Sequence, residues 1–497
     1  MRRRPGVVVA LTAALCLGAS AATSDSSGGK PGFVTFELAS TPPAPVGTTC
    51  PGSGDCWNHA VEPAIRADGA GSFYVSSENG LFEGTIAARS SDGGLHYASL
   101  ASPNAFSSSA DVGFAPGGGD TDLATAPARN AAGFFNVYVA SLTLGDVSVS
   151  TSVDGGTTWR LNPTSAEIPG DDREWIAADG ASKVCISYHD LVTFNVDVDC
   201  SYDAGTTFSQ HAPTGAIDAA HAFLLQNNQI GNLAIDPVSH VVYQVIAGIA
   251  SPAEIACGFR GTCAYHAVWM AVSSNGGSTF TDYPVYVGAS DQVGYAHNFP
   301  NVTVDRAGNV YALFSDDHDV YYVFSADRGR TWSAPVRVNS APAKTAIFPW
   351  AVAGDAGKLD VVYYGMSADS SNSSSATWYA YFAQNLNAAS PRSSFTQVRA
   401  TPVVHRGGVC ESGISCSGNR DLFDDFGVAA SPTTGLASIA YTSDQYGTKE
   451  ISRPGCTEQS SNTLRCDHTS IATQTGGSGI FGDRRGNHEG DDDDRSG

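Results

Sequence analysis

Basic residues and methionine are scarce in this chain of 497 residues. Lysine and arginine together number 27, against 49 aspartates and glutamates, so the formal net charge is −22. This deficit of positive charge argues against nucleic acid or an anionic membrane as a partner. Only 3 methionines accompany 54 glycines, a balance that favours many strands and tight turns over long helices.

Long hydrophobic runs are also missing after residue 21, where no stretch approaches the length of a membrane span. At the N-terminus, three arginines precede the apolar run PGVVVALTAALCLGA, and a series of small residues ends at Ala21. This pattern predicts a secretory signal peptide over residues 1–21. Leu15 is unfavourable before a lipoprotein cysteine at Cys16, so we expect a freely secreted, extracellular monomer.

Cysteines are few and lie close together in pairs. Apart from Cys16, they fall into the pairs 50/56, 185/200, 257/263, 410/416 and 456/466. An even number at short separations in an exported chain predicts five local disulfides. A zinc framework is the alternative, but such frameworks favour gaps of two to four residues.

Against this background, one short motif recurs five times. The copies are SSDGGLHY from Ser90, SVDGGTTW from Ser152, SYDAGTTF from Ser201, SSNGGSTF from Ser273 and SADRGRTW from Ser325. The shared frame is Ser-x-Asp-x-Gly-x-x-aromatic, with Asn275 in place of Asp once. The Asp or Asn side chain accepts hydrogen bonds from nearby backbone amides, and the glycine permits a positive φ. Each octamer therefore predicts a tight turn between strands.

A second repeat lies between the octamers, as a short strand of small apolar residues that ends in Asp or Pro. The copies end at Asp68, Pro127, Asp179, Asp236, Asp305, Asp355 and Pro432, and each precedes a β-rich run. Their spacing suits four-stranded propeller blades. We expect small residues at the axis, because innermost strands crowd together there. The prediction is an all-β, seven-bladed β-propeller with the octamers between the third and fourth strands, or six blades if one weak repeat is an insertion.

The same patterns set the domain limits. The propeller is predicted over residues 45–473, after an N-terminal segment over 22–44. FVTFELAS at residues 33–40 is expected to add a strand beside TSIATQ and close the ring without an open edge. Residues 474–497 are acidic, have no hydrophobic pattern and are predicted to be disordered.

The octamers resemble the Asp-box repeats of sialidases and related propellers. The resemblance implies a propeller fold whose octamer aspartates are structural, and it favours a sialidase-like exo-glycosidase. The chain lacks a Phe-Arg-Ile-Pro motif near the first blade, so no sialidase catalytic residue is carried over. A non-catalytic propeller that binds glycan or protein is the alternative, because propellers host unrelated functions.

Chemistry is expected on the face opposite the octamers, where the loops into each innermost strand and the loops between second and third strands gather. Carboxylates and a phenol there fit glycoside hydrolysis, and arginines and histidines fit substrate binding. The predicted catalytic residues are Glu174, Asp425, Asp190 and Tyr364, and the predicted substrate-binding residues are Arg173, Arg420, His189 and His297. The expected substrate is an extracellular glycan or glycoprotein, and no organic cofactor is expected.

A metal site is a further hypothesis for this face. The run of Asp316, Asp317, His318 and Asp319 offers oxygen ligands and an imidazole. Clustered carboxylates suit Ca²⁺, which takes six to eight oxygen ligands.

Overall fold

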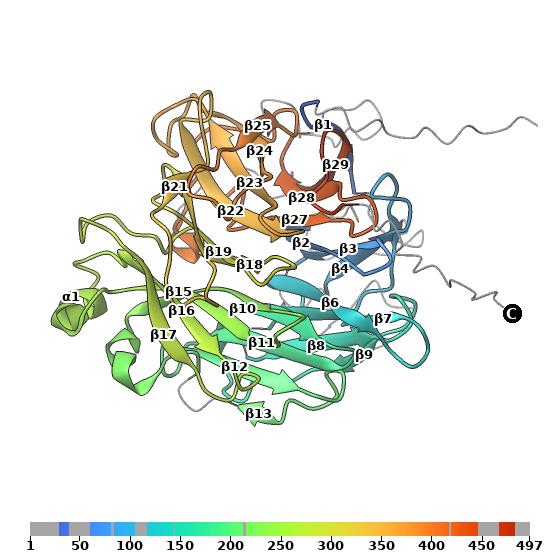
Figure 1. The fold of residues 1–497 in the computed structure, drawn as a ribbon, viewed down its shortest axis with the longest axis horizontal. Coiled ribbons are helices and arrows are strands. Elements are labelled where there is room, and N and C mark those ends of the chain that lie inside the picture. Colours follow the sequence, from blue (N-terminus) through green and yellow to red (C-terminus); the bar gives the residue numbers. More distant parts are fainter. Residues whose placement is uncertain are drawn as a thin grey trace, which may run out of the picture.

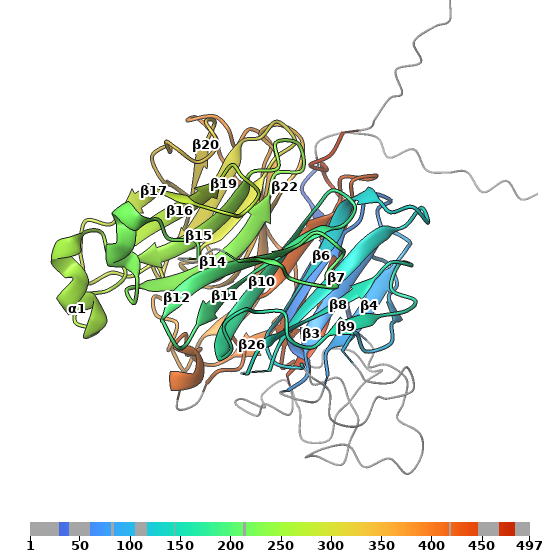
Figure 2. The same ribbon diagram turned by 90° about the horizontal axis from the view of Figure 1, so that it is seen from below.

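The computed structural model is a ring of seven antiparallel sheets (Figures 1 and 2). It describes residues 29–38, 60–80, 84–104, 117–143, 145–211, 215–416, 419–445 and 467–482. The predicted signal peptide, the pairs Cys50/Cys56 and Cys456/Cys466, and residues 483–497 of the predicted tail lie outside the described residues. Within the described part of the chain, no helix is long and apolar enough to span a membrane.

Blades 1 to 4 follow one another along the chain. Blade 1 holds β2 (Val61–Ala67), β3 (Phe73–Glu78), β4 (Ile86–Ser90) and β5 (Ala98–Ser99). Blade 2 holds β6 (Thr121–Arg129), β7 (Phe135–Leu142), β8 (Val147–Ser152) and β9 (Arg160–Asn162). Blade 3 holds β10 (Asp171–Asp179), β11 (Lys183–Asp190), β12 (Asn195–Ser201) and β13 (Gln210–His211). Blade 4 holds β14 (Asn228–Ile235), β15 (Val242–Gly248), β16 (Ala267–Ser273) and β17 (Thr281–Val287).

The remaining blades complete the ring. Blade 5 holds β18 (Asn301–Val304), β19 (Val310–Ser315), β20 (Val320–Ser325) and β21 (Val336–Arg337). Blade 6 holds β22 (Thr345–Ala353), β23 (Leu359–Met366), β24 (Thr377–Asn385) and β25 (Thr396–Arg399), and β26 (His405–Arg406) also pairs with β24. Blade 7 holds β27 (Gly427–Ala430), β28 (Ala437–Ser443), β29 (His468–Gly476) and β1 (Gly32–Glu37). The seven-bladed prediction is confirmed.

Four short helical segments lie in the connections between strands. They are the 3₁₀ turns η1 (Ala219–Leu224), η2 (Pro252–Glu254) and η3 (Gly413–Ser415) and the α-helix α1 (Ile255–Phe259). The segment that contains η2 and α1 projects from blade 4 (Figure 1).

The two ends of the described chain meet in blade 7. β1 pairs antiparallel with β29, with Phe36 opposite Ile471, so an N-terminal strand completes the last sheet. Beyond β29, Ile480 is fully buried, and its backbone N–H donates to the carbonyl oxygen of Gly435 at 2.9 Å. Residues 474–482 therefore pack on the propeller, in contrast to the prediction that disorder begins at residue 474.

Each octamer forms a turn between the third and fourth strands of blades 1 to 5. In every copy the glycine N–H donates to the serine Oγ, at 2.7 to 2.9 Å. The Asp or Asn side chain accepts a hydrogen bond from the backbone N–H four residues on, at 2.9 to 3.0 Å. Because these bonds are all local, the octamers build the blades and do not gather on one site.

Three described disulfides match predicted pairs. Cys185–Cys200 joins register partners on β11 and β12, and Cys257–Cys263 and Cys410–Cys416 close short loops. The latter two loops, in blade 4 and before blade 7, contribute residues to the pocket described below.

The axis differs from the expectation of small residues alone. Trp175 on β10 and Trp350 on β22 are buried, with ring centroids 5.1 Å apart. These strands belong to blades 3 and 6 and approach the centre of the ring from different sides (Figure 1). The 5.1 Å separation of the two rings therefore places both indoles near the axis. Aromatic side chains thus fill the channel at this level, and small neighbours such as Ala351 leave room for them.

We predict that Asp327→Ala will lower the free energy of unfolding by roughly 1–2 kcal/mol, because Asp327 accepts hydrogen bonds from Thr331 and Ser325. Urea denaturation followed by tryptophan fluorescence measures this. Asp327→Asn is the matched control and should lose less than half as much, since Asn275 makes the corresponding contacts with Thr279 in the fourth octamer. Equal losses in the two variants would contradict this account.

Candidate functional site

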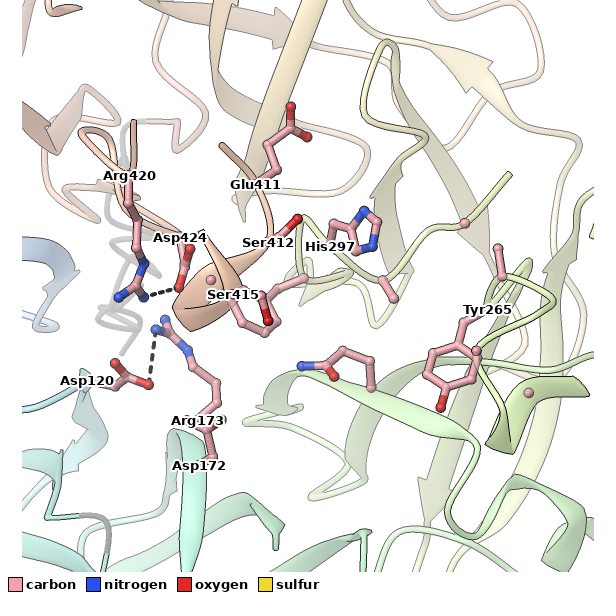
Figure 3. A pocket seen from close by; sticks show the side chains of 18 of the residues that line it. Asp120, Asp172, Arg173, Tyr265, His297, Glu411, Ser412, Ser415, Arg420 and Asp424 are labelled. Carbon is pink, nitrogen blue, oxygen red and sulfur yellow. Dashed lines mark hydrogen bonds and ion pairs between the residues drawn. The ribbon is translucent and has the colours of Figure 1, made fainter. Parts of the chain in front are cut away.

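A pocket of about 830 Å³ opens on the face opposite the octamers. The strands of a blade are antiparallel, so the loop between its first and second strands and the loop between its third and fourth strands lie at one end. The loop between the second and third strands and the connection to the next blade lie at the other end. The pocket is lined by the second group of loops, as predicted. The lining residues include Glu78 at the end of β3, Asp120 before β6, Asp172 and Arg173 at the start of β10, residues 261–265 between β15 and β16, His297 and Phe299 before β18, and several residues between 411 and 424. Figure 3 shows the pocket.

Arg173 is the central cation of this pocket, and its side chain is only 4% exposed. Its Nη1 lies 3.0 Å from Glu62 Oε2 and 3.7 Å from Asp120 Oδ2, and its Nη2 bonds Asp425. The guanidinium carbon lies 4.2 Å from the ring centroid of Trp175, so the guanidinium group packs against the aromatic side chains at the propeller axis. These contacts join blade 3 to blades 1, 2 and 7.

The backbone at two of these residues is unusual. Arg173 has φ of 61° and Glu62 has φ of 45°, and both lie at register shifts in the first strand pair of their blades. A bulge of this kind redirects a side chain relative to the regular pleat. The bulges therefore position both side chains, at a cost that the surrounding contacts offset.

Arg420 holds a second group of carboxylates beside the first. Its Nη2 bonds Asp424 and lies 3.4 Å from Glu62 Oε1. The Asp424 N–H also donates to Glu62 Oε1, at 3.1 Å. Both oxygens of the fully buried Glu62 are thus occupied by Arg173 on one side and by the loop into blade 7 on the other.

Glu78 differs from these paired carboxylates. One oxygen each from Glu62, Glu78 and Asp120 lies within 4.8 Å of the others. Burial, followed by the charge of Asp120, raises the pKa of the Glu78 carboxyl to about 8. No described residue forms a hydrogen bond with the Glu78 side chain, which lines the pocket. A carboxyl group with a raised pKa and no hydrogen-bond partner among the described residues therefore lies at the cavity beside Asp120.

A second polar group lies at the rim between blade 5 and the loop before blade 7. His297 Nδ1 lies 2.7 Å from Asp317 Oδ2, and this hydrogen bond raises the pKa of the imidazole. Asn298 donates to Glu411 at 3.1 Å, and burial raises the pKa of Glu411 to about 7. In Figure 3, His297 and Glu411 lie at a distance from Asp120, and Tyr265 lies at the far end of the cavity.

Three of the eight predicted catalytic and substrate-binding residues line the pocket: Arg173, Arg420 and His297. Asp425 lies immediately behind it, paired with Arg173, and burial raises its pKa to about 7. Glu174 and His189 do not line the pocket. Glu174 is fully buried, where burial raises its pKa, and burial lowers the pKa of His189.

Two predicted catalytic residues have structural positions instead. Tyr364 is fully buried in the hydrophobic core, where it stacks on Phe426 and donates to the carbonyl oxygen of Thr442 at 3.2 Å. Asp190 is also fully buried and accepts from the N–H groups of Val192 and Thr193 in the β11–β12 turn. Neither side chain lines the pocket, so the structure does not support a catalytic role for them.

The predicted metal ligands do not converge. Asp316 caps the backbone of its own loop, Asp317 binds His297 and Asn298, and Asp319 pairs with Arg337 at 2.8 Å. His318 Nδ1 lies 3.5 Å from Asp319 Oδ1, and among the described residues it forms no ion pair with Asp316 or Asp317. Within the described chain, the groups that bring three donor atoms together lie elsewhere, because each side chain of this loop already faces a different neighbour.

Glu78, Asp120 and Glu411 are among the ionisable pocket residues that the sequence patterns did not single out. Glu78 and Asp120 occupy loops that it assigned to this face, yet a single chain offers no signal that separates them from other loop carboxylates. Their proximity depends on how blades 1 and 2 pack, which local patterns do not encode.

The comparisons with known proteins give the fold context. No protein-family model matches the chain, and no curated protein matches it. Among solved structures, a Dyadobacter fermentans protein of unknown function is 12% identical, with a TM-score of 0.45 over 84% of this chain and 94% of that one. A Penicillium chrysogenum α-L-arabinanase complexed with arabinobiose is 10% identical, with a TM-score of 0.43 over 88% and 98%.

A third similar structure, a GH74 xyloglucanase from Xanthomonas campestris, is 10% identical, with a TM-score of 0.46 over 82% of this chain and 52% of that one. The fold is thus similar to those of glycoside hydrolases at low identity.

We predict that Arg173→Met will lower the free energy of unfolding by about 3–5 kcal/mol, because it removes the cation that pairs with Asp425 and with the Oε2 atom of Glu62 in a buried site. Chemical denaturation at neutral pH measures the loss. The control is Arg337→Met, which removes a half-exposed ion pair with Asp319 and should cost less than about 1 kcal/mol. Similar small losses in both variants would show that the buried network contributes little.

Proposed function

We propose that the protein is a secreted glycoside hydrolase that acts on extracellular glycans at this pocket. The observation that supports it most directly is the pair of Glu78 and Asp120, two carboxyl groups in different environments on the wall of one cavity. Glycoside hydrolysis needs such a pair, one carboxyl that holds a proton and one that is ionised. No organic cofactor enters this scheme.

Glu78 is the proposed general acid. Its pKa of about 8 keeps the proton on the carboxyl at neutral pH, ready for the glycosidic oxygen of the leaving group. Asp120 is the proposed nucleophile, and its Oδ2 lies 3.7 Å from Arg173 Nη1. The oxygens of the two groups lie within 4.8 Å of each other. Retaining enzymes hold their carboxyl groups about 5–5.5 Å apart and inverting enzymes about 6.5–9.5 Å, so retention is the proposed outcome.

The charge of the pocket favours a neutral sugar. A sialoside carboxylate needs arginines that are available to it, whereas Arg173 and Arg420 are already paired with Glu62, Asp425 and Asp424. An anionic substrate would also meet Asp120 and the other acidic groups of the wall. The sialidase-like specificity expected from the octamers therefore gives way to a neutral exo- or endo-glycosidase in this proposal.

A glycan-binding propeller without turnover is the second candidate. The ion-pair network around Arg173 joins four blades, so its residues also have a purely structural use. Under this alternative, Glu78 and Tyr265 would provide a hydrogen-bonding group and an aromatic surface for a bound sugar. The two candidates differ in whether the bond is cleaved.

We predict that Glu78→Gln will lower kcat for the best substrate by about 10²- to 10⁴-fold, because glutamine has no proton to deliver. The measurement is release of fluorophore from a panel of neutral aryl glycosides and an α-sialoside by the purified protein. In the unmutated protein, activity should be lost as the pH rises through about 8, where Glu78 ionises. Glu78→Gln should lack this alkaline limb in its residual activity.

Asp369→Asn serves as the control, because this side chain is 76% exposed and pairs only with Lys344 at 3.2 Å. Its kcat should match that of the unmutated protein. Residual activity above one third in Glu78→Gln would remove the acid assignment. A protein that binds glycans but cleaves none of the panel, nor intact polysaccharides, would support the binding alternative instead.

A further inference from the structure

A buried cluster of three aspartates and one histidine lies outside the pocket, beside the segment that leads into blade 7. It comprises His405 on β26, Asp421 before β27, Asp444 after β28 and Asp467 before β29. All four residues are at most 1% exposed. One donor atom each from His405, Asp421 and Asp444 lies within 4.8 Å of the others.

The contacts within this cluster leave its negative charge unbalanced. His405 Nδ1 lies 2.8 Å from Asp444 Oδ2, and Gln445 donates to Asp444 Oδ1 at 2.5 Å. No lysine or arginine of the described chain forms an ion pair with Asp444 or Asp467. One protonated imidazole can balance the charge of only one of the three carboxylates. Burial of the remaining unpaired negative charge costs free energy.

Asp467 provides the independent observation. The residue is fully buried, and neither of its carboxylate oxygens has a hydrogen-bond partner among the described residues. Ser443 on β28 is the register partner of His468 on β29, so Asp444 and Asp467, the next residues beyond those strand ends, lie side by side. A fully buried carboxylate with two unoccupied oxygens beside two others is what a cation site requires.

We propose that His405, Asp421, Asp444 and Asp467 bind one divalent cation. Three carboxylates and one imidazole are donors that Zn²⁺, Mn²⁺ and Ca²⁺ accept to different degrees. The site is distinct from the predicted run at 316–319, and it does not depend on the proposed hydrolase activity. Its cation joins β26 at the edge of blade 6 to three segments of blade 7.

The location gives the cation a defined task. Asp421 directly follows Arg420, and the segment from His405 to Asp424 supplies Glu411, Ser412, Arg420 and Asp424 to the pocket wall. Since His405 and Asp421 lie near the two ends of that segment, one cation fixes both ends. The cation therefore holds the wall of the pocket in place while remaining outside it.

The test begins with the unmutated protein. Its bound Ca, Mn and Zn are measured by mass spectrometry before and after treatment with chelator, and its melting temperature is followed at each stage. We expect about one equivalent of one metal that the Asp467→Asn variant lacks. We also expect chelation to lower the melting temperature and re-addition of that metal alone to restore it.

Asp467→Asn is compared with Asp360→Asn in the same assays. Asp360 is also fully buried with one unpartnered oxygen, but the neighbour of its carboxyl group is the amide of Gln384, at 2.9 Å, and not a second carboxylate. Asp467→Asn should weaken binding of the restoring metal at least tenfold by calorimetry, whereas Asp360→Asn should not change it. If Asp467→Asn does not fold, the metal content and chelator response of the unmutated protein decide the matter. Absence of all three metals with no rise in melting temperature on their addition, or undiminished binding in Asp467→Asn, would overturn the proposal.

Discussion

The structure around the pocket depends on the burial of one cation, the guanidinium of Arg173. Placed over Trp175 at the axis and away from water, it requires anionic partners with correct geometry, and blades 1, 2 and 7 each supply one. The positive φ values at Arg173 and Glu62 follow from the same requirement, since the bulged backbone turns both side chains toward the shared contact. Buried ion pairs therefore fix the positions of loops from separate blades relative to one another.

This arrangement divides the carboxyl groups of the open face into two kinds. Glu62, Asp424 and Asp425 are occupied by arginines and backbone amides, and these contacts maintain the structure. The Glu78 side chain lies beside them with no hydrogen-bond partner among the described residues, and burial and the charge of Asp120 raise its pKa to about 8. The difference in surroundings, rather than in residue type, separates a structural carboxylate from one suited to acid catalysis.

The loop before blade 7 is held from both sides. Toward the axis, Arg420 and Asp424 pair with each other and with Glu62. Away from the axis, Asp421 joins the buried cluster of His405, Asp444 and Asp467. A disulfide between Cys410 and Cys416 shortens the free length between these anchors. Buried acidic groups in this part of the molecule are thus accommodated by arginine, by a retained proton and, in our proposal, by a metal ion.

The sequence alone determined the repeating parts of this protein. The octamers and the small-residue strands predict seven four-stranded blades, the ring-closing strand and the face that carries the pocket, because each depends on residues close together in the chain. Tertiary structure decided which side chains meet. Tyr364 lies in the core and Asp190 in a turn, while Glu78 and Asp120 come together from different blades. Neighbours across blades, and the burial that shifts a carboxyl pKa, follow from packing of the whole ring and not from local periodicity.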